Sequence, residues 1–261
     1  MRSPLSLALA IALAGPAAGQ SIVVPPGGWP PQVIPTMPEP GQPQFRISAG
    51  SPSFMGEGGN GASGSYGGGA GYSATPGDAT AVLATLSSQS YGQTAISTAQ
   101  RLGVNPVTTA AIGSAESDFR NVSTANGKTT AGGVWQITGP TWNDAVARYN
   151  LPYSEADRGR SEAQAVVSNY IIREYAATTQ NALGRPVTTQ DVWGSYLFGP
   201  RDGIKVAAAG ASPDTPLSDL VSTSSLSNNG MSGWTVGQWQ TYANQRLGGA
   251  AGHTALQAPG S

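Results

Sequence analysis

The side chains available for chemistry are few, and their types exclude several enzyme mechanisms. The 261-residue chain has no cysteine, one histidine (His253) and two lysines (Lys128 and Lys205). Without cysteine there is no thiol nucleophile, disulfide or thiolate metal site. A lone histidine near the C-terminus argues against a Ser-His-Asp triad or a multi-histidine metal site, and no serine stands three residues before either lysine. We therefore expect chemistry based on carboxylates, hydroxyls, amides and aromatic rings, with no metal and no cofactor.

Glu116 is the acidic residue whose setting best suits acid–base chemistry. It ends a predicted helix of small and apolar residues, and no lysine or arginine occurs between Arg101 and Arg120. A carboxyl group partly removed from water, with no cation close to it in the sequence, has a raised pKa. A raised pKa is what a general acid needs near neutral pH. The alternative is that Glu116 caps the N-terminus of a neighbouring helix.

The other glutamates of the folded part fit structural or surface roles rather than catalysis. Glu155 and Glu162 lie in polar sequence flanked by arginines, where a carboxylate is solvated or caps a helix. Glu174 follows Arg173 on the polar face of a long predicted helix, which indicates a surface position.

The elements that would position Glu116 are helices. Asn105-Pro106 and Pro140 each place proline at a helix start, and the patterns beginning at Ser161, Thr188 and Thr235 are capping boxes. Predicted helices cover 79–86, 94–102, 106–117, 140–149, about 162–183, a segment after 188, and 236–247. Residues 121–138 alone look irregular or extended, and no β-α-β alternation occurs. The predicted class is mainly α, with a small irregular or hairpin segment.

Segments of different composition flank this helical domain, which we place at 79–248. Residues 1–20 have a positive start, a short apolar run and small residues, which is typical of a secretory signal peptide. Residues 21–78 are rich in glycine and proline and predict a disordered linker, and 249–261 predict a flexible tail. We therefore expect an exported protein, in the periplasm or outside the cell, with no membrane span after signal cleavage. A net charge of −1 gives no basic patch for nucleic acid.

Three short motifs, in this order and spacing, resemble the lytic transglycosylase and goose-type lysozyme superfamily. The family pattern is Glu-Ser-x-Phe, a Ser/Gly-rich stretch, a Gly-Leu-Met-Gln-like segment and a Thr-Ala or Thr-Trp helix start. This chain has Glu116-Ser117-Asp118-Phe119, then Gly132-Gly133-Val134-Trp135-Gln136-Ile137, then Thr141-Trp142. The resemblance covers about 91–200, with weaker agreement to 247. It implies a lysozyme-like helical fold and cleavage of the β-1,4 bond between N-acetylmuramic acid and N-acetylglucosamine in peptidoglycan.

The resemblance also implies roles for individual residues. Glu116 matches the catalytic acid/base, Ser117 the serine that contacts the acetamido region of the substrate, and Gln136 the glutamine that lines the cleft. Tyr196, in the segment 194–200, is either the ring whose hydroxyl supports the glutamate or substrate, or a core residue. Trp135 is either a platform on which a sugar ring stacks or part of the core.

The chain departs from the family pattern in three places. Val134-Trp135 stands where the family has Leu-Met, the Glu-to-Gln gap is about two residues longer with 128–130 as the insertion, and no asparagine follows Tyr196. These departures affect the prediction of the substrate subsites more than the prediction of the reaction.

The pattern identifies one catalytic carboxylate, whereas most glycosidases use two. Asp118 would point to a different helix face, and Asp144 fits a surface position. The resemblance implies a lytic transglycosylase, in which the substrate's 2-acetamido group assists Glu116 and the product is a 1,6-anhydro sugar. The alternatives are a hydrolytic, lysozyme-like muramidase and a non-catalytic glycan-binding or assembly module. The expected partner is a peptidoglycan strand, with secretion or envelope machinery as a further candidate.

Overall fold

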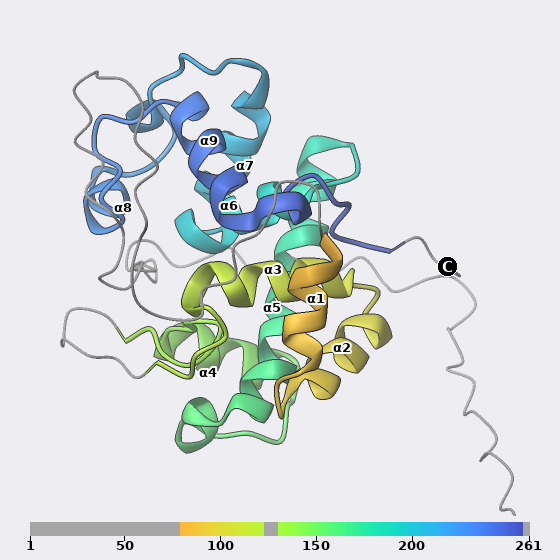
Figure 1. Cartoon of the computed structure of the whole chain (residues 1–261). Coiled ribbons are helices and arrows are strands. Elements are labelled where there is room, and N and C mark those ends of the chain that lie inside the picture. The colour runs from red at the N-terminus through yellow and green to blue at the C-terminus, as the bar shows by residue number, and fades with distance from the viewer. Residues whose placement is uncertain (1–78, 123–129, 258–261) are drawn as a thin grey trace, which may run out of the picture. The chain divides into compact units, whose positions relative to one another are not determined.

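The computed structural model describes residues 79–122 and 130–257, and this part of the chain is mainly helical (Figure 1). The helices are α1 (Ala79–Ser87), α2 (Gly92–Arg101), α3 (Pro106–Ser117), α4 (Gly139–Arg148), α5 (Ser161–Leu183), α6 (Thr189–Phe198), α7 (Pro200–Ala208), α8 (Thr223–Asn228) and α9 (Val236–Leu247). Short 3-10 turns include η1 (Glu155–Gly159) and η4 (Gly248–Ala250). The prediction of a mainly α class is therefore confirmed.

Local capping explains where several helices begin. The Asn105 side chain accepts a hydrogen bond from the Val107 amide, and Pro106 takes the first helical position of α3. Thr138 caps α4 in the same way, while α6 and α9 start with the capping boxes that the sequence predicts. The predicted capping box at Ser161 is wrong, because α5 has no side-chain cap and the Gln164 amide points elsewhere.

Helix α3, which bears Glu116, is packed on nearly every face. It contacts α1, α2, α5, α6, α9 and η4. Small residues allow this close approach: a Cβ atom added to Gly113 would lie 3.0 Å from Nε1 of Trp135. A helix buried all round needs no strong amphipathic stripe, and this accounts for its run of alanine, glycine and serine. The C-terminal end of α3 is thus set into the core.

The segment after α3 forms paired backbone without regular strands. Its described part contains isolated antiparallel bridges that join Val122 to Gly133 and Gly132 to Ile137. The predicted irregular or hairpin segment is therefore present in reduced form. Residues 123–129, which include most of the insertion expected at 128–130, lie outside the described residues.

The C-terminal segment differs from its prediction. Residues 249–257, expected to be part of a flexible tail, pack onto the helical domain, with Ala251 and Ala255 buried. The Asn105 amide donates to Ala255 O at 2.8 Å, and the Ala255 amide donates to Val187 O at the same distance. Apolar alanines and backbone pairing therefore anchor this segment, and the folded domain extends at least to 257.

Two helices, α7 and α8, are absent from the sequence-based prediction. Pro200 opens α7 directly after Gly199, whose φ of +82° ends α6. Gly203 then lets α7 lie against α6, because an added Cβ there would be 2.3 Å from the Cα of Ser195. The close turn between these helices depends on glycine.

The signal peptide and linker predictions, at 1–20 and 21–78, lie outside the described residues. Within 79–122 and 130–257, no helix has the length and apolar character needed to cross a membrane.

Candidate active site

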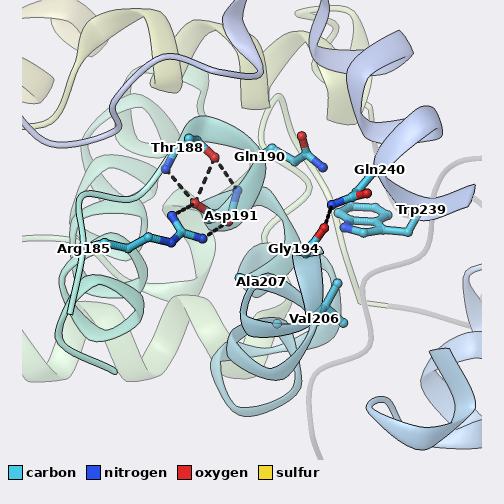
Figure 2. Close-up of a pocket in the computed structure, with 11 residues that line it drawn as sticks. Arg185, Thr188, Gln190, Asp191, Gly194, Val206, Ala207, Trp239 and Gln240 are labelled. Carbon is cyan, nitrogen blue, oxygen red and sulfur yellow. Dashed lines mark hydrogen bonds and ion pairs between the residues drawn. The ribbon is translucent and has the colours of Figure 1, made fainter. Parts of the chain in front are cut away.

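One pocket of about 250 Å³ lies among α6, α7 and α9, and Glu116 is not among the residues that line it (Figure 2). Its two charged side chains and Gln240 already have partners. Arg185 and Asp191 form an ion pair at 2.8 Å, and the Gln240 amide donates to Gly210 O at 2.9 Å. Trp239 lines the pocket, but its ring is 2% exposed. The ionisable side chains of this pocket are paired with each other, and Glu116, the residue best suited to acid–base chemistry, lies outside it.

Glu116 sits in the last turn of α3 and is 5% exposed. The indole Nε1 of Trp193, on α6, donates a hydrogen bond of 2.8 Å to its Oε1. Burial raises the pKa of the Glu116 carboxyl to about 7, although the indole hydrogen bond and the charge of Arg246 both act in the opposite direction. Loss of hydration outweighs these two attractions. A carboxyl group with this pKa is populated in both protonation states near neutral pH, as an acid/base requires.

Arg246 supplies the positive charge that the local sequence lacks. It lies in the last turn of α9, and its Nη2 donates a hydrogen bond to Ala115 O, the carbonyl just before Glu116. The sequence analysis missed this residue because the two positions are far apart in the chain. An arginine in the last turn of a helix is a common pattern, and nothing in it indicates a buried carboxylate as a neighbour.

Ser117 ties the end of α3 to the following loop. Its hydroxyl donates to Val134 O at 2.7 Å, and the residue is 3% exposed. The chain then turns through positive φ at Asp118 and Phe119, where the Tyr91 hydroxyl donates to Phe119 O. The local role of Ser117 is thus to fix the loop beside Glu116.

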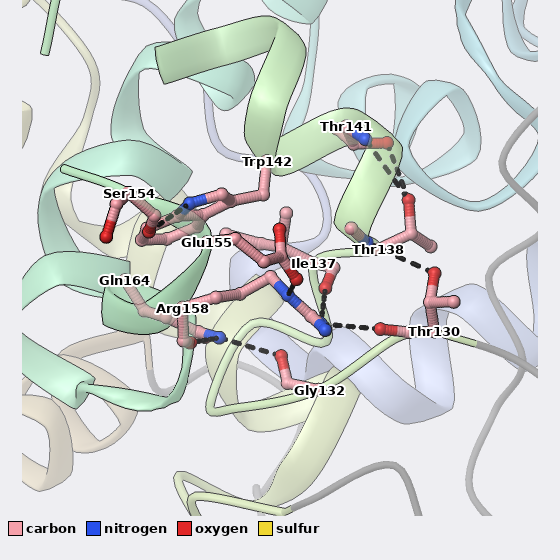
Figure 3. A network of polar contacts seen from close by, with 11 residues as sticks. Thr130, Gly132, Ile137, Thr138, Thr141, Trp142, Ser154, Glu155, Arg158 and Gln164 are labelled. Atoms are coloured by element: carbon pink, nitrogen blue, oxygen red, sulfur yellow. Dashed lines mark hydrogen bonds and ion pairs between the residues drawn. The ribbon is translucent and has the colours of Figure 1, made fainter. Parts of the chain in front are cut away.

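The loop that bears Gln136 is held by buried polar contacts (Figure 3). Gln164, on α5, accepts from the Trp135 amide at 3.1 Å and donates to the carbonyls of Gly132 and Arg158, each at 2.8 Å. Gly133 has φ of +79°, and a Cβ there would fall 1.8 Å from the Gln164 amide nitrogen. Glycine at 133 is therefore needed for this close approach.

Arg158 strengthens the same loop from η1. Its guanidinium donates to Thr130 O and, at 3.2 Å, to Ile137 O, and its Nε pairs with Glu155 at 2.6 Å. Glu155 thus orients an arginine that fastens both sides of the loop, as Figure 3 shows.

Gln136 has an unusual backbone, with φ of +47°. Its side-chain amide donates to Gly133 O at 2.7 Å, and the residue is 5% exposed. Gln136 therefore lies on the loop whose Val134 carbonyl accepts the Ser117 hydrogen bond, and its side-chain amide binds the backbone of that same loop.

Trp135 belongs to the core, which corrects the stacking role considered for it. The ring is fully buried, its Nε1 donates to Thr109 O at 3.1 Å, and Tyr91 packs edge-on against it at 5.7 Å. No ring face is exposed for a sugar.

Tyr196 is also fully buried, and its hydroxyl donates to Trp135 O at 2.7 Å. The Glu116 charge contributes to raising the pKa of Tyr196, so the two residues lie within electrostatic range.

An aromatic row extends from Glu116 toward the surface. Tyr242, on α9, stacks against Trp193 with ring centroids 5.8 Å apart and planes at 23°, and Trp234 meets Tyr242 edge-on at 5.5 Å. Trp193 is buried, whereas Tyr242 and Trp234 are half-buried. The sequence analysis placed Trp193 within its helix but did not connect it to Glu116.

Several other acidic residues form ion pairs with arginines. Asp118 is exposed near Arg120, while Asp144 and Glu174 both pair with Arg148. Among the described residues, no second carboxylate contributes to the pKa of Glu116. The same part of the chain contains no cluster of three acidic or histidine side chains suited to a metal ion.

Neither the known protein families nor the curated proteins contain a match to this chain.

Proposed function

We propose that this chain is a peptidoglycan lytic transglycosylase with a lysozyme-like helical fold. The observation that supports it best is Glu116: a buried carboxyl at the end of a helix, hydrogen-bonded to Trp193, with a pKa near 7. Ser117 follows Glu116 directly, and its hydroxyl donates to Val134 O on the loop that bears Gln136, which is the order that the resemblance implies. The proposed substrate is the β-1,4 bond between N-acetylmuramic acid and N-acetylglucosamine.

In the proposed reaction, Glu116 acts first as an acid and then as a base. Its proton goes to the glycosidic oxygen, the bond from that oxygen to C1 breaks, and the 2-acetamido group of the muramic acid stabilises the positive centre at C1. The Glu116 carboxylate then removes the proton from the C6 hydroxyl, whose oxygen attacks C1. The products are a 1,6-anhydro sugar and a free 4-hydroxyl, and no water is consumed.

A single carboxylate favours this route over a two-carboxylate hydrolysis. Retaining and inverting glycosidases place their carboxyl pairs roughly 5–5.5 Å or 6.5–9.5 Å apart. Asp118 and Asp144, the two acids nearest in sequence, are exposed and paired with arginines. Substrate assistance removes the need for a second protein carboxylate, so a site in which no other described carboxylate acts on Glu116 suits the transglycosylase reaction.

The aromatic row is the proposed contact for the glycan. Tyr242 and Trp234 are half-buried, and Tyr242 stacks on the indole that binds Glu116. Aromatic rings of this kind offer apolar area for the C–H face of a pyranose. In this proposal they stack against the sugar in place of Trp135, which is buried and has no exposed ring face.

The proposal also covers the setting of the enzyme. Export to the periplasm or cell exterior rests on the signal-like residues 1–20, and residues 21–78 would act as a tether between the catalytic domain and a secretion or envelope partner.

The test is product analysis on purified peptidoglycan with the wild type, Glu116→Gln and Glu162→Gln. The last is a matched control, because Glu162 is exposed in the first turn of α5. We expect 1,6-anhydro ends, lighter by one water than reducing ends, from the wild type and the control, and loss of roughly 10²–10⁴-fold in turnover for Glu116→Gln. Only reducing ends would establish the muramidase alternative. Binding without any cleavage would establish the non-catalytic module.

A further inference from the structure

The end of α3 is an unfavourable place for a carboxylate. Glu116 lies in the last turn, where the partial negative charge of the helix C-terminus repels an anion. The side chain is also 5% exposed, so water does little to solvate the ionised form. The base half of the proposed reaction nevertheless requires Glu116 to exist as an anion.

Arg246 is built into this position rather than exposed on the surface. Its Nη2 hydrogen-bonds to Ala115 O in the last turn of α3, while its buried Nε has no hydrogen-bond partner. A buried guanidinium N–H without a partner is rare and costs free energy. A cation that satisfies a C-terminal carbonyl of α3, and whose Nε–H has no partner, is suited to stabilise the ionised form of Glu116.

The other groups around Glu116 leave Arg246 as the source of positive charge. Helices α1 and η4, which pack on α3, contain no ionisable side chains, and those of α2 and α5 do not contribute to the pKa of Glu116. From α6, Trp193 donates its neutral indole N–H, and Tyr196 is an un-ionised phenol whose hydroxyl binds Trp135 O. Arg246, from α9, is the charged residue of the described part that acts on Glu116.

We propose that Arg246 is a positioning residue for Glu116: from α9 it holds the C-terminal end of α3 and stabilises the carboxylate left after proton donation. Its catalytic meaning rests on the proposed function, since it favours the change of Glu116 from acid to base after proton donation. Its physical role is that the guanidinium favours the ionised form of Glu116. This role is a property of the folded protein and can be measured without substrate.

The structure provides both a reporter and a matched control. The Trp193 indole N–H donates to Glu116, so its NMR signal should titrate with that carboxyl group, and Trp193→Phe and Glu116→Gln identify the signal. Arg173 is the control: its Nε donates to Leu102 O, the C-cap carbonyl of α2, so it has the same helix-end role without Glu116.

The experiment follows the indole signal against pH in the full chain without substrate. We expect a midpoint near 7 in the wild type and in Arg173→Met. In Arg246→Met the midpoint should rise by about 1 pH unit, and Arg246→Lys, which keeps the charge, should bring it back toward the wild type. An unchanged midpoint in a folded Arg246→Met protein would overturn the proposal.

A second measurement uses the wild-type protein, so it does not depend on whether an Arg246 variant folds. In the wild type, the Arg246 Nε–H signal should shift with the same midpoint as the Trp193 indole, and an Arg246 signal that does not change across that range would also refute the proposal. Because both titrations are read without glycan, they stand even if the peptidoglycan assay fails. If that assay succeeds, Arg246→Met should move the alkaline limb of kcat/KM to higher pH and lower kcat more than it changes KM.

Discussion

Replacing Glu116 with glutamine should stabilise the folded protein at alkaline pH and have little effect at acid pH. Burial raises the pKa of this carboxyl from 4.5 to about 7. The difference corresponds to about 3 kcal/mol between its protonated and ionised forms. The folded wild type keeps the proton at pH values where the unfolded chain has released it. Its free energy of unfolding therefore falls as the pH rises from about 4.5 to about 7, and glutamine avoids that loss.

The assay is urea unfolding of the wild type and Glu116→Gln at about pH 4 and about pH 8, followed by tryptophan fluorescence. The free energy of unfolding of the variant relative to the wild type should increase by up to about 3 kcal/mol between the two pH values. Glu162→Gln should show no such change, because Glu162 is exposed. A Glu116→Gln difference that is independent of pH would refute the reasoning, since it would mean that Glu116 is solvated or already ionised in the folded state.

Further outcomes follow from the same contacts. The kcat/KM of the wild type on peptidoglycan should be constant below about pH 7 and fall about tenfold per pH unit above it, as a pH–rate profile would record. Trp193→Phe removes a hydrogen bond that lowers the pKa of Glu116, so the alkaline limb of that profile should move to higher pH. Gln164→Leu breaks three hydrogen bonds, two of them fully buried, and should cost about 3–5 kcal/mol in urea unfolding, whereas Gln240→Leu, with one bond to Gly210 O, should cost about 1 kcal/mol. Trp234→Ala should raise KM severalfold with kcat nearly unchanged, and Trp234→Phe, which keeps an aromatic ring, should bring KM back toward the wild-type value. If both variants instead lower kcat and raise KM by the same factors, Trp234 does not act by stacking on the sugar.

Contacts between near neighbours in the chain are what the sequence predicts well. The starts of α3, α4, α6 and α9 follow from caps and prolines that act within one helical turn. The same reasoning fails at Ser161, where the pattern of a capping box is present but Gln164 instead binds the loop at 132–135. A glutamine that satisfies several buried backbone groups gains more than one that caps a single amide, and only the fold brings those groups together.

Burial is the second point on which the sequence is incomplete. Whether Trp135 is available to a sugar or buried in the core depends on what packs against it. The groups that do so, α3, Tyr91 and Gln164, are far from Trp135 in the sequence. The tail at 249–257 is a similar case, because its alanines are uninformative until Asn105 and Val187 provide backbone partners.

The sequence by itself determined a mainly helical domain and singled out Glu116, because helix periodicity and the absence of nearby cations are local properties. Only the tertiary structure decided how that carboxyl is held. Trp193 lies 77 residues away and Arg246 lies 131 residues beyond Ala115, yet both meet the end of α3. The reason is physical: the pKa of a buried group depends on distance through space and on lost hydration, which are set when α3, α6 and α9 pack together.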